Sequence, residues 1–264
     1  MHVDLTGRTA VVTGSSTGIG LAIATGLARA GASVVLTGRG AGRLGDAADR
    51  LAERLPDADL TTLTADLATD EGAAVLRDAV PDTDILVNNL GIFGSRAPLE
   101  ITDEEWRTYF ETNVLSAIRL IRAYLPGMKD RGWGRVLNIS SESGIAIPAE
   151  MIHYGTSKTS MLAVSRGFAK DAAGTGVTVN SVIVGPTHTG GVEDFVYELV
   201  DRAVPWEQAQ HEFMRQFRPS SLIQRLIEPE EVAHMVVYLS SPQASATTGA
   251  AVRVDGGCVD SILP

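Results

Sequence analysis

The chain has one cysteine, Cys258, among 264 residues, and only 5% of its residues are aromatic. A single cysteine excludes an intrachain disulfide and a cysteine-rich metal site, so we predict no bound metal. No apolar run approaches the roughly 20 residues that a membrane-spanning helix needs. The first eight residues mix acids and bases without an apolar core, unlike a secretory signal peptide. We therefore expect a cytoplasmic protein with no membrane partner.

The chain also lacks an excess of positive charge. It has 22 Lys and Arg against 32 Asp and Glu, which gives a formal net charge of −10. This balance argues against nucleic acid or an anionic membrane surface as the main partner. It still allows an anionic cofactor, because a phosphate site needs only local backbone amides and one or two cations.

Short valine-rich runs alternate with longer helix-like segments along the chain. The predicted strands are Thr9–Thr13, Ser33–Gly38, Leu60–Ala65, Ile85–Asn88, Arg135–Ser140, Val177–Val182 and Ala251–Val254. The predicted helices are Ile19–Ala30, Ala41–Leu55, Asp70–Ala79, Asp103–Arg131, Ile152–Ala173 and Pro229–Ser240. Several strands are apolar throughout, as expected when helices cover both faces of a sheet. The pattern predicts one α/β domain over residues 1–264, a doubly wound (Rossmann) seven-stranded parallel sheet with helices on both faces.

The segment from Thr189 to Leu226 breaks this alternation. It contains two predicted helices, near Val192–Arg202 and Trp206–Phe217. It follows the carboxyl end of a strand, where open α/β sheets bind ligands, so we interpret residues 189–226 as a helical substrate lid. The alternative is a surface helix pair used only for packing. Its five aromatic rings either line an apolar substrate pocket or fasten the lid to the body: Phe195, Tyr197, Trp206, Phe213 and Phe217.

A glycine-rich loop follows the first predicted strand and opens a helix. From Thr13 it reads Thr-Gly-Ser-Ser-Thr-Gly-Ile-Gly. Glycines permit a tight turn and let backbone amides approach a pyrophosphate, whose charge the helix N-terminus favours. The strand–loop–helix context supports a dinucleotide-binding loop. Its predicted cofactor contacts are Gly14, Ser16, Thr17, Gly18, Ile19 and Gly20.

The spacing Gly-x-x-x-Gly-x-Gly resembles that of the classical short-chain dehydrogenases and reductases. Further motifs of that family follow in order over nearly the whole chain: Asp66-Leu67, Asn88-Asn89-Leu90-Gly91, Asn113, Ser141, Tyr154-Gly155-Thr156-Ser157-Lys158, Pro229-Glu230-Glu231-Val232-Ala233 and Val254-Asp255-Gly256-Gly257. The chain is identified as a member of this family on that series. The resemblance implies an oxidoreductase that interconverts a carbonyl and an alcohol by hydride transfer with a nicotinamide cofactor.

Tyr154 and Lys158 are four residues apart, so on a helix they share one face. A free tyrosine has a pKa of about 10, and a neighbouring ammonium is expected to lower it. The resemblance implies that Tyr154 exchanges the proton with substrate and that Lys158 also holds the nicotinamide ribose. It implies that Ser141 hydrogen-bonds the substrate oxygen. It further implies that the backbone carbonyl of Asn113 keeps a water in a proton relay toward Lys158.

The residue at the end of the second predicted strand indicates whether the cofactor is NAD(H) or NADP(H). A carboxylate there accepts hydrogen bonds from the adenosine ribose and rejects a 2′-phosphate. Gly38 occupies that position, and Arg39 follows with a guanidinium suited to a phosphate. NADP(H) is therefore favoured, with NAD(H) as the second choice because Thr17 stands where many NADP-dependent relatives carry another basic residue. The resemblance adds further cofactor contacts: Asp66, Leu67, Asn89, Gly91, Tyr154, Lys158, Thr187 and Thr189.

Several functions remain open from the residues. The leading one is the interconversion of a ketone or aldehyde and a secondary alcohol, in either direction, on an apolar substrate, with a 3-oxoacyl thioester as one option. The alternative from another class is a catalytically idle NADP(H)-sensing regulator, against which the intact Ser141, Tyr154 and Lys158 argue. An epimerase or dehydratase would have a different glycine spacing, and an enoyl reductase would space Tyr154 and Lys158 more widely. The resemblance also implies a homo-oligomer, a tetramer or a dimer.

Overall fold

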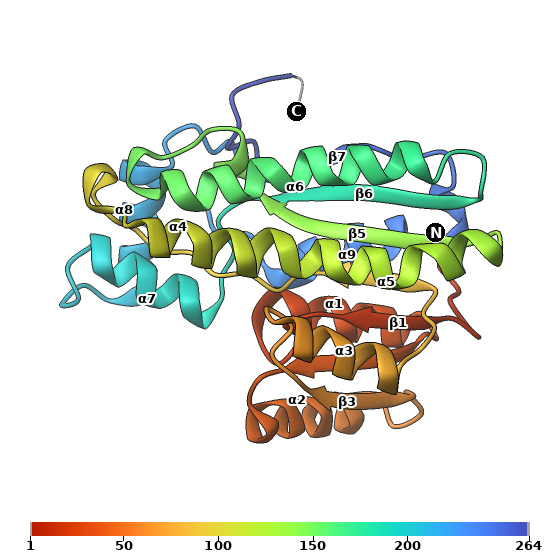
Figure 1. Ribbon diagram of the computed structural model, residues 1–264. Helices are drawn as coiled ribbons and strands as arrows, with labels where there is room; N and C mark the ends of the chain where they lie inside the picture. Colours follow the sequence, from red (N-terminus) through yellow and green to blue (C-terminus); the bar gives the residue numbers. More distant parts are fainter. Residues whose placement is uncertain (1, 263–264) are drawn as a thin grey trace.

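The computed structural model describes residues 2–262 and builds them around a seven-stranded sheet (Figure 1). Its strands are β1 (Thr9–Val12), β2 (Ser33–Gly38), β3 (Leu60–Thr64), β4 (Ile85–Asn88), β5 (Gly134–Ser141), β6 (Val177–Val184) and β7 (Ala251–Val254). All neighbouring strands are parallel, in the order β3-β2-β1-β4-β5-β6-β7. The strand order reverses between β1 and β4, and this switch point opens a crevice at their carboxyl ends. The predicted doubly wound α/β fold is confirmed.

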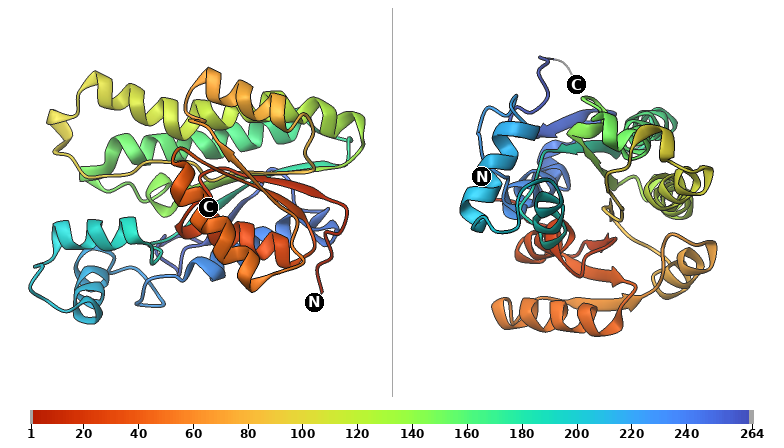
Figure 2. Two further views of the ribbon diagram at one scale, coloured as in Figure 1. Left: turned by 90° about the horizontal axis from the view of Figure 1, so that it is seen from below. Right: turned by 90° about the vertical axis from the view of Figure 1, so that its left-hand side faces the viewer.

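Helices cover both faces of the sheet (Figure 2). The first core cluster lies under α1 (Gly18–Arg29), α2 (Ala41–Arg54) and α9 (Pro229–Leu239). The second lies under α3 (Asp70–Ala79), α5 (Ser116–Asp130) and α6 (Ile152–Asp171). In β1, Ala10 and Val12 belong to the first cluster, and Val11 belongs to the second. Because successive side chains of a strand point to opposite faces, a strand covered on both sides is apolar at every position.

One predicted helix, Asp103–Arg131, is not continuous in the structure. It consists of α4 (Asp103–Phe110), the π-helical turn η2 (Glu111–Leu115) and α5. In the turn, the Ser116 N–H bonds to the Glu111 carbonyl, five residues back instead of four. Such a bulge inserts one extra residue into a helix, often at a functional site. Here it contains Asn113, whose side chain is held by the segment after β4.

The 189–226 insertion contains α7 (Gly190–Leu199) and α8 (Trp206–Phe217). Two helices were predicted here, and the second has the predicted bounds. The first begins two residues earlier than predicted, because the Thr189 hydroxyl caps it by accepting the Val192 N–H at 3.3 Å. It ends three residues earlier than predicted, where Val200 adopts an extended backbone conformation. In Figure 1 both helices extend past the carboxyl ends of β5 and β6. Within residues 2–262, none of the helices is long and apolar enough to cross a membrane.

The remaining helices are short 3₁₀ helices between the longer elements. They are η1 (Pro98–Glu100), η3 (Glu142–Gly144), η4 (Ala149–Met151) and η5 (Pro242–Ala244). The turn η3 follows directly after β5, so that strand places Ser141 and its neighbours at the crevice.

Candidate active site

The glycine-rich loop between β1 and α1 is fixed to the end of β4. The Thr13 hydroxyl accepts the N–H groups of Asn89 and Leu90, each at 2.9 Å. The Asn89 amide donates to the carbonyls of Thr13 at 3.0 Å and Gly14 at 3.1 Å. A Cβ on Gly20 would lie 2.4 Å from the Gly14 oxygen, so only glycine allows this close approach.

The first turn of α1 has the features of an anion site. Thr17, its N-cap residue, makes no side-chain capping bond within residues 2–262, and the first turn carries no acidic residue. Its leading N–H groups therefore lack a side-chain acceptor, while the helix dipole is positive at this end. Gly18 has φ +56, which lets the backbone pass close to a ligand. Loop and helix together fit the diphosphate of a nicotinamide dinucleotide.

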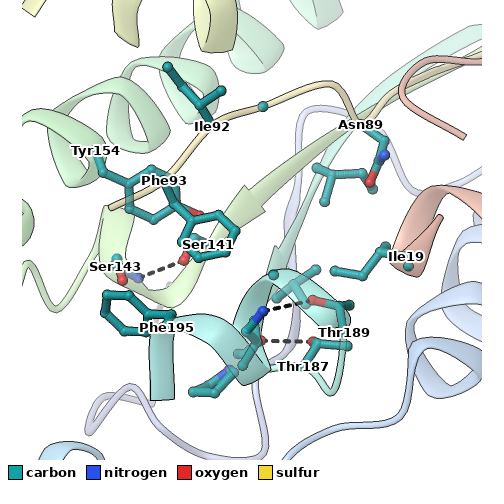
Figure 3. A pocket seen from close by; sticks show the side chains of 18 of the residues that line it. Ile19, Asn89, Ile92, Phe93, Ser141, Ser143, Tyr154, Thr187, Thr189 and Phe195 are labelled. Atoms are coloured by element: carbon teal, nitrogen blue, oxygen red, sulfur yellow. Dashed lines mark hydrogen bonds between the residues drawn. The ribbon is translucent and has the colours of Figure 1, made fainter. Parts of the chain in front are cut away.

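A pocket of about 550 Å³ lies at the carboxyl ends of the strands, between this loop and the 189–226 insertion (Figure 3). Eleven of the predicted site residues line it: Thr17, Gly18, Ile19, Gly20, Asn89, Gly91, Ser141, Tyr154, Lys158, Thr187 and Thr189. Among the described residues, six predicted ones lie outside its lining: Gly14, Ser16, Arg39, Asp66, Leu67 and Asn113. The pocket also contains residues that the sequence did not single out: Arg43, Ile92, Phe93, Glu142, Ser143, Met151 and Arg218.

Lys158 lies at the back of the pocket, almost fully buried. Its ammonium donates to the Ile139 carbonyl at 2.9 Å, and the Ser140 hydroxyl bonds to the Lys158 carbonyl at 2.9 Å. Burial disfavours the charged form and lowers the pKa of Lys158 to about 8. The Lys158 Nζ stands 5.7 Å from the centroid of the Tyr154 ring, so both side chains face the same space.

Tyr154 faces Ser141 and Phe93 in the pocket (Figure 3). Burial raises its pKa above the usual 10, and a hydrogen bond with Ser141 acts in the opposite direction. The predicted lowering of the Tyr154 pKa by Lys158 is therefore wrong for the protein alone. The physical reason is that burial destabilises the charged phenolate by more free energy than nearby polar groups restore by stabilising it.

Asn113 supports the site from outside the pocket. Its side chain accepts the Ile92 N–H at 2.8 Å and donates to the Ile92 carbonyl at 3.0 Å. It also donates to the Ser157 hydroxyl at 2.9 Å. A Cβ on Gly91 would lie 3.3 Å from both Asn113 Oδ1 and Lys158 Nζ. The π-helical turn, the segment after β4 and helix α6 thus meet at one point behind the pocket.

Ser141, at the end of β5, belongs to a buried polar cluster. Its hydroxyl donates to Glu142 Oε2 at 2.5 Å and accepts the Ser143 N–H at 3.1 Å. The other oxygen, Glu142 Oε1, accepts from the Ser143 hydroxyl at 3.2 Å and from Arg218 Nε at 3.1 Å. The side chains of Glu142 and Arg218 are 8% and 12% exposed. Arg218 follows α8 directly, so this ion pair links the 189–226 insertion to Ser141.

Removing one partner of this pair should destabilise the fold. In Glu142→Ala the Arg218 guanidinium stays buried without its counter-charge, so we expect a loss of about 3–5 kcal/mol in the free energy of unfolding. Urea denaturation followed by circular dichroism measures it. Glu198→Ala, an exposed position on α7, is the matched control and should change stability by less than about 0.5 kcal/mol. Equal stabilities for the two variants would contradict the buried-pair interpretation.

Beyond the glycine loop, the carboxyl edge of β2 and β3 carries the remaining predicted residues. Arg39 and Asp66 are exposed there, and Asp66 accepts the Ala68 N–H at 3.1 Å. Leu67 is 3% exposed and packs in the second core cluster, which leaves its side chain little surface for an adenine ring. Arg43, in the first turn of α2, does line the pocket. The sequence could have indicated Arg43, because it lies only four residues after Arg39, which was predicted to contact the cofactor.

Among residues 2–262 there is no cluster of three His, Cys, Asp or Glu side chains that could hold a metal ion. Phe195 and Phe213 line the pocket, whereas Tyr197, Trp206 and Phe217 pack the insertion together. The aromatic rings of the insertion thus divide between the two roles considered from the sequence.

Sequence and structure comparisons find similar proteins over nearly the whole chain. A family model described as Enoyl-(Acyl carrier protein) reductase matches residues 14–259. The uncharacterized oxidoreductase YvaG of Bacillus subtilis (strain 168) is 46% identical over 264 residues, covering 100% of both chains. A D-beta-hydroxybutyrate dehydrogenase of Rhizobium meliloti (strain 1021) is 34% identical, over 95% of this chain and 98% of the relative. The structure of L-sorbose reductase from Gluconobacter frateurii, complexed with NADPH and L-sorbose, superposes with a TM-score of 0.93 at 32% identity, covering 99% and 100%.

Proposed function

Because this chain belongs to the short-chain dehydrogenase/reductase family and is an oxidoreductase of that type, we propose that it interconverts a ketone or aldehyde and an alcohol with a nicotinamide cofactor. One observation carries the proposal. Ser141, Tyr154 and Lys158 line the same pocket as the glycine-rich loop, so proton-exchanging side chains and a diphosphate cradle face one space. The solved relative with NADPH supports the cofactor class.

The pocket residues divide between holding the cofactor and handling the proton. The loop at Thr17–Gly20 would hold the diphosphate, and Asn89, Gly91, Thr187, Thr189 and Lys158 would hold the remaining parts. When bound, the nicotinamide supplies the electron pair and the hydrogen that the carbonyl carbon gains. The protein must then supply one proton to the carbonyl oxygen.

Tyr154 is the proton donor in reduction. Its raised pKa keeps the phenol protonated at neutral pH, so it carries a proton to give. As the carbonyl becomes an alcohol, the tyrosine O–H bond breaks and a bond from the same proton to the substrate oxygen forms; oxidation reverses both changes. Ser141 holds that oxygen with its hydroxyl, which rotates between Glu142 and the substrate.

Lys158 and Asn113 complete the proposed proton path. The ammonium stabilises the negative charge that develops on Tyr154 as the proton leaves. The Asn113 backbone carbonyl holds a water that returns a proton toward Lys158. The π-helical turn supports this role, because such a turn disrupts the regular helical bonding of nearby backbone groups.

The 189–226 insertion acts as the substrate lid of a single domain spanning residues 1–264. Phe195 and Phe213 from the insertion, together with Phe93 and Met151, give the substrate region an apolar surface. This surface suits an apolar part of a ketone, including a 3-oxoacyl thioester. The names of the hydroxybutyrate and sorbose enzymes support a carbonyl–alcohol couple. A homotetramer and a cytoplasmic location stay predictions.

The function is tested by following NADPH oxidation with a panel of aldehydes, ketones of graded size and a 3-oxobutanoyl thioester. We expect turnover with at least one carbonyl compound and formation of the corresponding alcohol. Tight NADPH binding without turnover of any of them would overturn the proposal and favour the sensing regulator. Reduction of an enoyl thioester in place of every carbonyl would instead favour the activity named in the family model.

NADP(H) preference is proposed to depend on Arg39 and Arg43. Both are exposed beside the β2 end of the crevice, where Gly38 stands in the position of the carboxylate that would oppose a 2′-phosphate. Because charge-assisted hydrogen bonds to that phosphate would be lost, Arg39→Ala/Arg43→Ala should lower kcat/KM for NADPH by about 10–100-fold. The value for NADH should stay within about threefold. Arg54→Ala, at the far end of α2, is the control, and equal losses with both cofactors would contradict the assignment.

A further inference from the structure

The Glu142–Arg218 ion pair lies inside the candidate substrate pocket, beside Ser141 and Tyr154. The stability of the fold does not explain why this ion pair is present, because replacing a buried ion pair with apolar side chains of similar volume is often neutral or stabilising. The ring of Phe213, whose centroid lies 5.6 Å from the Arg218 guanidinium carbon, is an apolar neighbour that could pack against such a replacement. A costly charged pair at this position therefore points to a ligand.

The hydrogen-bonding capacity of the pair is only partly used. Arg218 Nε bonds to Glu142, and its Nη1 bonds to the Phe217 carbonyl at 2.7 Å. Its Nη2 has no hydrogen-bond partner among residues 2–262, although a guanidinium has five N–H donors. The Glu142 carboxylate accepts three bonds and has about four acceptor positions. The pair thus offers free donors and one free acceptor side by side.

A hydroxyl group is the ligand chemistry that matches this surface, because it donates one hydrogen bond and accepts others. An anionic group would meet the Glu142 carboxylate, and a cationic group would meet the Arg218 guanidinium. The pair is neutral overall, so it gives no net attraction to either charge. Glu142 bonds to Ser141 directly, which places the Glu142 carboxylate next to the proposed site of the reacting oxygen, with Arg218 bonded to its other oxygen.

We propose that Glu142 and Arg218 form a subsite for an uncharged hydroxyl group adjacent to the reacting carbonyl, so that the preferred substrates are α-hydroxy ketones. This inference rests on the proposed carbonyl reduction and adds the substrate class. The apolar surface of Phe93, Phe195 and Phe213 then contacts the rest of the molecule.

The test compares two ketones of equal heavy-atom count, 1-hydroxybutan-2-one and pentan-3-one, with 2-oxobutanoate as the anionic comparison. For the wild-type enzyme with NADPH we expect kcat/KM to be at least about tenfold higher for the hydroxy ketone than for either of the others. Because a hydroxy ketone is intrinsically more reactive, the decisive quantity is the change in this ratio between enzyme variants.

The variant Glu142→Leu/Arg218→Met removes both charges and their hydrogen-bonding groups together, so that no buried charge is left unpaired. We expect its ratio of hydroxy ketone to pentan-3-one to fall by about tenfold. Arg215→Met, an exposed position near the end of α8, is the matched control and should keep the wild-type ratio. An unchanged ratio in the folded double variant would overturn the subsite.

A second measurement needs no variant. In wild-type enzyme with NADPH bound, butane-1,2-diol should inhibit at least about tenfold more strongly than pentan-3-ol, and equal inhibition would overturn the proposal. The two hypotheses fail in different ways. Turnover of both ketones without a hydroxyl preference overturns only the subsite, whereas absence of turnover for every carbonyl compound overturns the proposed function.

Discussion

Replacing Tyr154 with phenylalanine should lower kcat for ketone reduction by about 10²–10⁴-fold, the usual contribution of a positioned proton donor. The phenyl ring keeps the edge contact with Phe93, whose centroid lies 6.2 Å away, so the pocket should keep its shape. Only the hydroxyl that supplies the proton is lost. Steady-state NADPH oxidation measures the rate, and fluorescence titration should give an NADPH Kd within about threefold of wild type.

The matched control is Tyr238→Phe, on α9 and outside the active-site pocket. It should retain the wild-type rate, because Tyr238 does not line the pocket that contains Tyr154, Lys158 and Ser141. If Tyr154→Phe reduced ketones as fast as this control, Tyr154 would not be the proton donor.

Replacing Lys158 with methionine should lower kcat by about 10²-fold or more and change its pH dependence. A lysine is charged below its pKa, and burial lowers the pKa of Lys158 to about 8. The wild-type rate of reduction should therefore fall as the pH rises through about 8, while the phenol of Tyr154 stays protonated. In Lys158→Met that fall should disappear, since the titrating group is gone.

The pH profile of kcat at saturating NADPH measures this effect. Lys170→Met is the control, because Lys170 is exposed in the last turn of α6. It should keep both the wild-type rate and the decline near pH 8. A decline near pH 8 that persists in Lys158→Met would assign it to another group and contradict the role given to Lys158.

The sheet could be predicted from the sequence because strands that are buried on both faces are rich in apolar residues. Strand β6 is buried at all eight positions, and five of its residues are Val or Ile, while the segments between the strands have helical length and pattern. The π-helical turn could not be predicted. Its Asn113 bonds to Ile92, 21 residues earlier, and local helix patterns do not report such a tertiary contact.

The candidate site was predictable where its residues are close in sequence or fixed in order. The glycine-rich loop and the Tyr154–Lys158 spacing are of this kind. The Glu142–Arg218 pair was missed because its members are 76 residues apart and neither forms a local motif. The direction of the Tyr154 pKa shift was wrong because residue spacing reports which side chains are near but not how much water they lose.

The most direct test of the central claim is a crystal structure of the protein with NADP⁺ bound. We expect the dinucleotide to run from Arg39 and Arg43 past the Gly14–Gly20 loop, with its nicotinamide ring against Tyr154 and Lys158. Density for the nicotinamide anywhere else, with that pocket empty, would contradict it.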